Sequence, residues 1–393
     1  GISIVGWICA SLGAVLLAVV FGYLGKLVPD ANGGPFAYTR LGMGDFAAYL
    51  VAWGYWVSIW CANAAITVAV VGYLAVFFPI LGESAIASVA TGLAIVWFFT
   101  WINSKEIKTV ALVQIIATTL KIAPILLIGI WGMFYVQAEN FTPFNLTGES
   151  NFSVITTTTM LTFFAFLGME SATIPSGSVQ DSATTVRKAT VFGTLATVVI
   201  YIISSVAIMG VIPAEVLAES SGPFADVAEI FWGGAAKYIV AAGAVIATMG
   251  ALNGWILMQG AIPMAAAQAG LFPKIFGKVN TAHSPVYGIV ISSSIVSIFM
   301  LFNYSNSLVE TFSYMMQLTT LAVTIPFLFS IMSLVLLLKK SSAGFYKKCA
   351  VAICAFAFTV WIMVGCGAEV LISGLVLFLL GIPFYFLISR EKA

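Results

Sequence analysis

Charged residues are scarce in this chain of 393 residues, because Asp, Glu, Lys and Arg make up only 8% of it. A soluble protein carries about a quarter, so the composition excludes a soluble domain. The formal net charge is +1, and nothing in it indicates a nucleic-acid partner. The single histidine, His283, excludes a histidine-rich metal site. The five cysteines lack metal or disulfide spacing, so we expect no metal and no cofactor.

Hydrophobic residues, in contrast, make up 61% of the chain. They form repeated runs of about twenty residues or more, which are typical of transmembrane helices. We predict eleven spans, at 3–25, 46–78, 84–102, 109–136, 153–177, 188–212, 234–267, 285–303, 308–338, 348–366 and 369–388. The sequence therefore predicts an all-α, multi-pass membrane protein.

Lysine and arginine alternate from one loop to the next. Basic residues lie in the loops after the first, third, fifth, seventh and ninth spans, and also at the C-terminus. The opposite loops hold only Lys237. By the positive-inside rule, the basic loops and the C-terminus are cytoplasmic in the cell (inner) membrane. Segment 213–233 is then an outward loop that can include a short amphipathic helix, and 270–285 is an inward loop.

The fifth span carries a glycine, a carboxylate and a proline within eight positions, in the stretch 161–177, which reads LTFFAFLGMESATIPSG. Such a run crosses hydrocarbon only if its freed backbone groups and its charge face protein or water. Secondary transporters build their substrate sites from broken helices of this kind. We therefore expect a transporter whose site lies at Gly168 and Glu170.

The start of the sequence leads to another expectation. The predicted orientation places residue 1 outside, yet it is Gly rather than Met and no signal peptide precedes it. If the broken span opens the second of two inverted repeats, the first repeat also needs a broken helix, and only four spans precede residue 153. We expect about twelve spans with the first absent: 1–140 as the rest of the first repeat, 153–338 as the second and 345–393 as a C-terminal pair.

Two ionisable side chains fall inside predicted spans. Glu170 is either a gating or proton-coupling carboxylate, or a structural carboxyl that accepts hydrogen bonds from freed amides. Lys121 lies about 18 Å from the cytoplasmic entrance by helix rise. It could bind and release a proton, stand where a sodium ion sits in related folds, or place its head on backbone carbonyls.

Other candidates are aromatic or hydroxyl-bearing. Trp255 either fills space between helices or forms an aromatic wall for a ligand, including a cationic one. Tyr55, Ser58 and Asn63 recur on the second span, where polar groups usually bond across helices. Thr319 is a weaker candidate because threonine commonly bonds its own helix.

Several motifs together resemble the amino acid–polyamine–organocation (APC) superfamily. They are TFFAFLGMESA with PSGSVQD, then ALNGW, then GLFPKIFGKVNTAHSP, and earlier GGPFAY. The resemblance covers essentially the whole chain and is closest to the bacterial arginine/agmatine and putrescine/ornithine antiporter group. It implies a LeuT-type 5+5 inverted-repeat fold with two extra C-terminal helices, of which the family's first helix is absent here.

The resemblance also implies roles for the candidates. It implies substrate contacts at Phe164, Ala165, Leu167, Gly168, Trp255, Ser58, Asn63, Phe312 and Thr319. It implies gating or proton coupling at Glu170, Lys121, Tyr55 and Phe327. Two positions depart from the antiporters: Phe164 replaces a tryptophan that stacks on guanidinium, and Lys121 replaces a small apolar residue. A lysine there resembles the proton-coupled permeases and heteromeric exchangers of the same superfamily.

The predicted function is secondary active transport of amino acids by alternating access, as amino acid/amine exchange or proton-coupled uptake. A proton-coupled symporter of neutral amino acids is the alternative. An ion channel would need a filter ring that the sequence does not provide, and an enzyme would need a catalytic cluster. The expected partners are an amino acid or amine, protons and the lipid bilayer, and a homodimer stays open.

Overall fold

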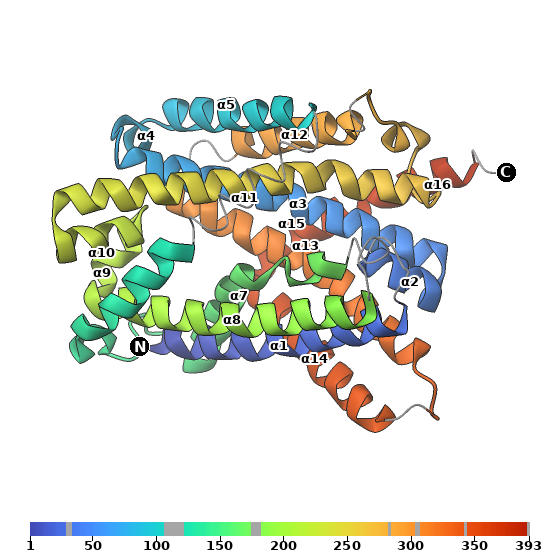
Figure 1. Cartoon of the computed structure of the whole chain (residues 1–393), viewed down its shortest axis with the longest axis horizontal. Coiled ribbons are helices and arrows are strands. Elements are labelled where there is room, and N and C mark those ends of the chain that lie inside the picture. Colours follow the sequence, from blue (N-terminus) through green and yellow to red (C-terminus); the bar gives the residue numbers. More distant parts are fainter. Residues whose placement is uncertain are drawn as a thin grey trace.

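The computed structural model describes residues 1–28, 34–105, 122–173, 182–281, 284–302, 307–341 and 344–390, and they form helices and loops without a strand (Figure 1). Nine described helices are long and apolar enough to cross a membrane. They are α1 (Ile2–Leu27), α3 (Asp45–Ala75), α5 (Ala85–Asn103), α7 (Asn151–Phe163) with the turns after it, α8 (Ser182–Val211), α11 (Gly234–Gln268), α13 (Leu308–Leu337), α14 (Phe345–Gly365), and α15 (Gly367–Leu379) with α16 (Gly381–Arg390).

Two shorter apolar helices, Ile122–Tyr135 and α12 (Val286–Phe302), fall in the remaining predicted spans. The prediction of an all-helical membrane protein is therefore confirmed. The sequence did not predict α2 (Pro35–Met43), which begins with a proline at its first position, where a missing N–H is tolerated.

Helix α3 is the central element of the molecule. Its side chains are buried almost all round, which is typical of a helix that is apolar on every face. It packs against α13 and α11, and also against α2, α5 and α12. This central position carries Tyr55 and Ser58 into the interior.

The last predicted span, 369–388, is interrupted rather than continuous. Helix α15 ends at Leu379 and α16 begins at Gly381. Pro383 has no N–H for the carbonyl of Leu379, which weakens the helix at this point. Side chains of α3 bind carbonyls on both sides: the Trp53 indole donates to Leu377 (3.0 Å), and the Tyr49 hydroxyl donates to Gly381 (2.5 Å).

Successive spans run in opposite directions, and the two termini lie at opposite ends of the molecule (Figure 1). Most described cations lie at the end where α1, α5, α11 and α13 finish, which we call the basic end. Nine carboxylates lie at the other end, the acidic end: Glu83, Glu139, Glu149, Glu215, Glu219, Asp226, Glu229, Glu310 and Glu369.

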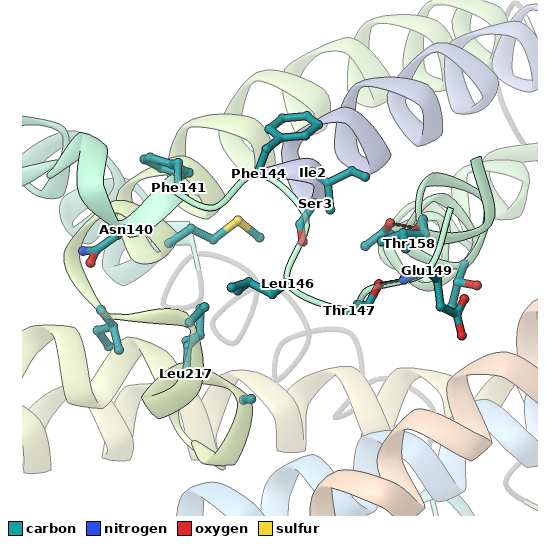
Figure 2. A pocket seen from close by; sticks show the side chains of 17 residues that line it. Ile2, Ser3, Asn140, Phe141, Phe144, Leu146, Thr147, Glu149, Thr158 and Leu217 are labelled. Atoms are coloured by element: carbon teal, nitrogen blue, oxygen red, sulfur yellow. Dashed lines mark hydrogen bonds between the residues drawn. The ribbon is translucent and has the colours of Figure 1, made fainter. Parts of the chain in front are cut away.

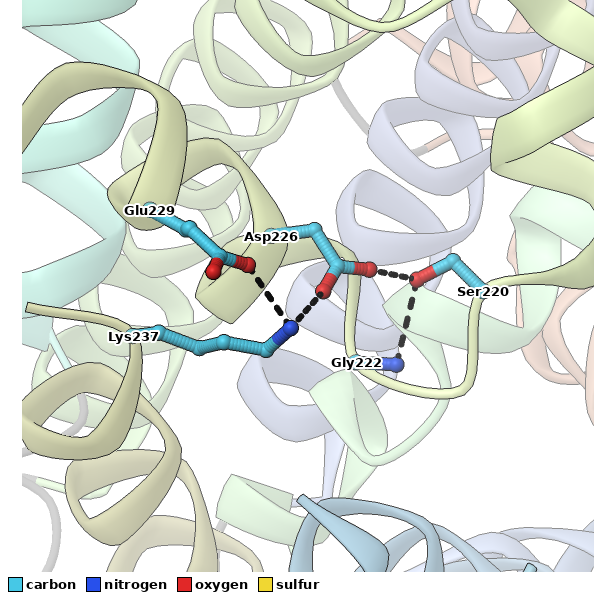
Figure 3. A network of polar contacts seen from close by, with 5 residues as sticks. All are labelled: Ser220, Gly222, Asp226, Glu229 and Lys237. Atoms are coloured by element: carbon cyan, nitrogen blue, oxygen red, sulfur yellow. Dashed lines mark hydrogen bonds and ion pairs between the residues drawn. The ribbon is translucent and has the colours of Figure 1, made fainter. Parts of the chain in front are cut away.

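The predicted amphipathic helix in 213–233 is present as α9 (Ala214–Glu219) and α10 (Pro223–Trp232), at the acidic end. Lys237, on the first turn of α11, reaches back to Glu229 (2.7 Å) and Asp226 (3.5 Å) on one face of α10 (Figure 3). Asp226 also accepts a hydrogen bond from Ser220, in the turn between α9 and α10. These contacts hold α10 against α11.

Candidate functional site

The fifth span is broken at the predicted place. Helix α7 ends at Phe163 and continues as a single 3₁₀ turn, Phe164–Phe166. Leu167 is extended, Gly168 has a φ of +96°, and a second 3₁₀ turn covers Met169–Thr173. Residues 174–181, with Pro175, lie outside the described residues. The break therefore leaves carbonyls near position 165 without the amides that a continuous helix would supply.

Two constraints act on Gly168. Its positive φ is a conformation that residues with a side chain rarely adopt. A Cβ atom at this position would also lie 3.1 Å from Cζ2 of Trp255. The glycine thus allows the indole of α11 to approach the backbone at the break.

Glu170 is buried just after the break, with 1% of its surface exposed. Its Oε1 accepts a hydrogen bond from the Tyr55 hydroxyl of α3 at 2.7 Å. Its Oε2 accepts one from the N–H of Gly168 at 3.1 Å. The carboxylate therefore both stabilises the break and connects it to the central helix, so the geometry suits the functional and the structural interpretations alike.

A cavity of about 380 Å³ lies between α3, the break, α11 and α13. A volume of this size is within the range of small-molecule sites. The cavity brings together nine predicted residues: Tyr55, Ser58, Phe164, Ala165, Leu167, Glu170, Trp255, Phe312 and Thr319. Phe164 and Phe312 contact each other edge to face, with ring centroids 6.2 Å apart.

Exposure of the lining residues differs between the two sides of the cavity. Its residues on the basic side, such as Tyr55 and Thr319, are buried, whereas Ile66 and Thr248 on the acidic side are partly exposed. Phe327 lies one helical turn beyond Val323, the cavity residue nearest the basic end on α13. It is fully buried against Phe21, with ring centroids 5.2 Å apart. Buried aromatic side chains therefore lie between this part of the cavity and the basic end.

Four predicted residues are not among the cavity's lining residues. Gly168 lines a second cavity of about 300 Å³ on the α8 side of the break. Asn63 is fully buried and donates from Nδ2 to Oε1 of Gln259 at 2.7 Å. Phe327 packs behind the wall, and Lys121 lies outside the described residues. Asn63 thus bonds a neighbouring helix, and its contact with substrate stays a prediction.

Sequence reasoning missed Tyr201, which lines both cavities. Its ring packs against Phe166 at the break, with centroids 5.5 Å apart. The sequence does mark this face of α8, because polar residues recur there at helical spacing, at Thr190, Thr194, Thr197 and Tyr201. Gln259 was also missed, since a lone glutamine in an apolar run has no periodic partner.

A larger cavity, of about 550 Å³, lies at the acidic end near the start of α1 (Figure 2). Phe141, Phe144, Leu146 and Glu149 line it together with Thr158 of α7. None of the predicted site residues lies on it. The candidate site is therefore the cavity at the break.

A bundle of membrane-spanning helices around a broken helix with a central cavity defines the class of secondary transporters. The chain belongs to the amino acid permease family, because that family's model matches residues 1–387. It is accordingly a membrane transporter and not an enzyme.

Individual relatives span most of the chain. A putative arginine/ornithine antiporter of Bacillus subtilis is 31% identical, over 98% of this chain and 89% of its own. An arginine/agmatine antiporter of Chlamydia pneumoniae is 28% identical, over 100% and 84%. A cadaverine/lysine antiporter of Escherichia coli K12 is 30% identical, over 91% and 82%.

A solved structure has the same fold. It is a manganese transporter from Eremococcus coleocola, with a TM-score of 0.57 and 11% identity, and the match covers 99% of this chain and 87% of that one. At this identity the likeness concerns the LeuT-type fold alone.

Proposed function

We propose that this protein exchanges a cationic amino acid for a related amino acid or amine across the membrane, by alternating access. The observation that carries the proposal is the central cavity, where Glu170, Tyr55 and Trp255 meet at the helix break. The names of the three relatives support the substrate class, since each pairs a basic amino acid with an amine or a second basic amino acid.

The cavity has the chemistry to bind such a substrate. The peptide groups of Phe164, Ala165 and Leu167 lie at the C-terminal end of α7, where the helix dipole is negative and an ammonium group is favoured. Trp255 and Phe312 provide aromatic surface, to which a cationic side chain is attracted. Among the described residues, the cavity carries one carboxylate and no cationic side chain.

The charge of the acidic end supports the same substrate class. Nine carboxylates lie there with a single described side-chain cation, Lys237, which is already paired. A field of one sign raises the local concentration of oppositely charged ligands. A cationic substrate would therefore be enriched at the side where the cavity's lining residues are partly exposed.

We propose that Tyr55, Glu170 and Phe327 form the barrier towards the basic end. Ser58, one turn from Tyr55, and Val323, one turn from Phe327, then line the cavity next to the barrier. Opening requires separation of the Tyr55 hydroxyl from Glu170 and release of the Phe327 ring from Phe21. Alternating access would follow from this movement together with closure at the acidic end.

We further propose that 1–140 and 153–338 are parts of two inverted repeats, followed by the helix pair in 345–393. The basic end would be cytoplasmic, as the positive-inside rule predicts. A second candidate function is proton-coupled uptake of neutral amino acids, which Lys121 in the fourth predicted span favours.

Uptake into proteoliposomes tests the proposal. The panel contains cationic, neutral and acidic amino acids and their amines, each with and without a pH gradient and with and without unlabelled substrate inside. We expect saturable uptake of arginine, ornithine or lysine that internal substrate accelerates. Uptake of neutral amino acids driven by the pH gradient alone would favour the second candidate, and uptake without accelerated exchange would contradict the antiport.

A further inference from the structure

Gln259, which lies behind the cavity wall on α11, bonds three helices together. Its Oε1 accepts from Nδ2 of Asn63 on α3 at 2.7 Å. Its Nε2 donates to the carbonyl of Ile289 (3.2 Å) and to Oγ of Ser293 (2.7 Å), both on α12. A carbonyl can only accept, so Ile289 fixes which end of the Gln259 amide faces α12 and which faces α3.

The backbone of Gln259 takes part because of a proline one turn later. Pro263 has no N–H, so the carbonyl of Gln259 lacks its partner within the helix. That carbonyl accepts from the Trp56 indole (2.9 Å) and from Oγ of Ser292 (3.1 Å) instead. The proline thus converts a helix carbonyl into a docking point for α3 and α12.

The network continues to a fourth helix. Oγ of Ser293 lies 2.6 Å from Oγ1 of Thr100 on α5. Gly260 and Gly288 allow α11 and α12 to cross closely, because a Cβ on Gly288 would lie 3.0 Å from the Cα of Gly260. Close crossings at small residues, with hydrogen bonds across them, are how membrane helices associate.

The network lies directly behind the cavity. Gln259 follows Trp255 by four residues on α11, and Asn63 lies between the cavity residues Ile59 and Ile66 on α3. We infer that Gln259 is a positioning residue: with Pro263 it fixes the register of α3 against α11, and so the distance between the Tyr55 and Trp255 walls of the cavity. The inference rests on the proposed transport function, because its consequence is read as substrate affinity.

The test compares Gln259→Met, Asn63→Leu and the double variant in proteoliposomes, with substrate half-saturation and Tm measured on the same preparations. Thr359→Val on α14 is the matched control, since this buried hydroxyl donates within its own helix, to the Ala355 carbonyl. We expect about a tenfold rise in half-saturation for each single variant, with no further rise in the double variant and less than a twofold change in the control.

Two outcomes would overturn the inference. The first is an unchanged half-saturation in a folded Gln259→Met protein; if Asn63→Leu still has an effect, Asn63 acts on substrate directly. The second is additive effects in the double variant.

Pro263→Ala provides a test that does not depend on removing the glutamine. It restores an N–H that competes for the Gln259 carbonyl, so we expect the effect of Trp56→Phe on Tm to shrink in this background. An unchanged effect of Trp56→Phe would contradict the role of the proline. If the unmodified protein transports none of the panel, the proposed function fails, while the Tm comparisons still report whether Asn63 and Gln259 are coupled.

Discussion

The Tyr55 hydroxyl and the Glu170 carboxylate lie 2.7 Å apart, although 115 positions separate the two residues in sequence. Tyr55 belongs to the central helix and Glu170 to the broken one. The bond therefore joins a continuous wall of the cavity to the broken one. The charge of Glu170 and the hydroxyl of Tyr55 can each be removed by substitution without changing the other.

Glu170→Gln removes the charge and keeps the size of the side chain. We expect half-saturation for a cationic substrate to rise about tenfold or more, because a hydrogen bond to a charged group contributes about 1.5–3 kcal/mol. Tyr55→Phe keeps the charge and should instead slow exchange or allow leakage. Exchange measured against substrate concentration separates these two effects. Glu369→Gln, at an exposed carboxylate, is the control. Equal substrate affinity in the wild type and in Glu170→Gln would refute the binding role of Glu170.

Gly168→Ala should impair both stability and transport. An L-residue at positive φ is disfavoured by about 1–2 kcal/mol, and the added Cβ would lie 3.1 Å from the Trp255 ring. We expect a lower Tm and weaker substrate binding. Gly148→Ala is the control, because this glycine also has a positive φ but open space around it. In Gly148→Ala the backbone strain should lower Tm without changing substrate affinity. Equal losses of affinity in both variants would show that the Trp255 contact is not the cause.

Trp255→Ala should weaken substrate affinity, whereas Trp255→Phe should restore part of it. Cation–π attraction contributes about 0.5–2 kcal/mol, which corresponds to a change of about 2- to 30-fold. The measurement is the binding isotherm of a cationic amino acid. Trp97→Ala on α5, at a residue that is 42% exposed and outside the cavity lining, controls for the loss of a tryptophan. An isotherm unchanged by Trp255→Ala would show that this tryptophan only fills space.

Lys121→Ala tests the coupling that the sequence alone predicts. If Lys121 binds and releases the coupled proton, the variant should insert normally but lose the dependence of uptake on pH. Uptake at several external pH values, normalised to the amount of inserted protein, provides the measurement. Wild-type pH dependence in the variant would exclude Lys121 from the coupling role.

Lys237→Met should have a small effect that depends on salt. The ion pairs of Lys237 are partly exposed, and such pairs contribute about 0–1 kcal/mol. Removal of the cation also leaves Asp226 and Glu229 as like charges on one face of α10. We expect Tm to fall slightly in low salt and the difference to vanish in about 1 M salt, where the Debye length is about 3 Å. A large, salt-independent loss would point to a packing role instead.

The helical architecture and the place of the break follow from the amino-acid sequence. A bilayer leaves no alternative partner for backbone groups, so long apolar runs become helices, and a Gly–x–Glu sequence within such a run has to face protein or water. The spans and the break at Gly168 followed from this rule, and the outward amphipathic segment before α11 followed from the alternation of basic loops.

The face that each polar residue presents depends instead on how the helices pack together. Ser58 and Asn63 lie five positions apart on α3, yet Ser58 lines the cavity and Asn63 bonds Gln259 behind it. A helix that is buried on every side has no polar stripe to mark its functional face. The roles of Asn63, Gln259 and Tyr201 therefore depend on which helices pack beside them, and contacts between distant segments set that choice.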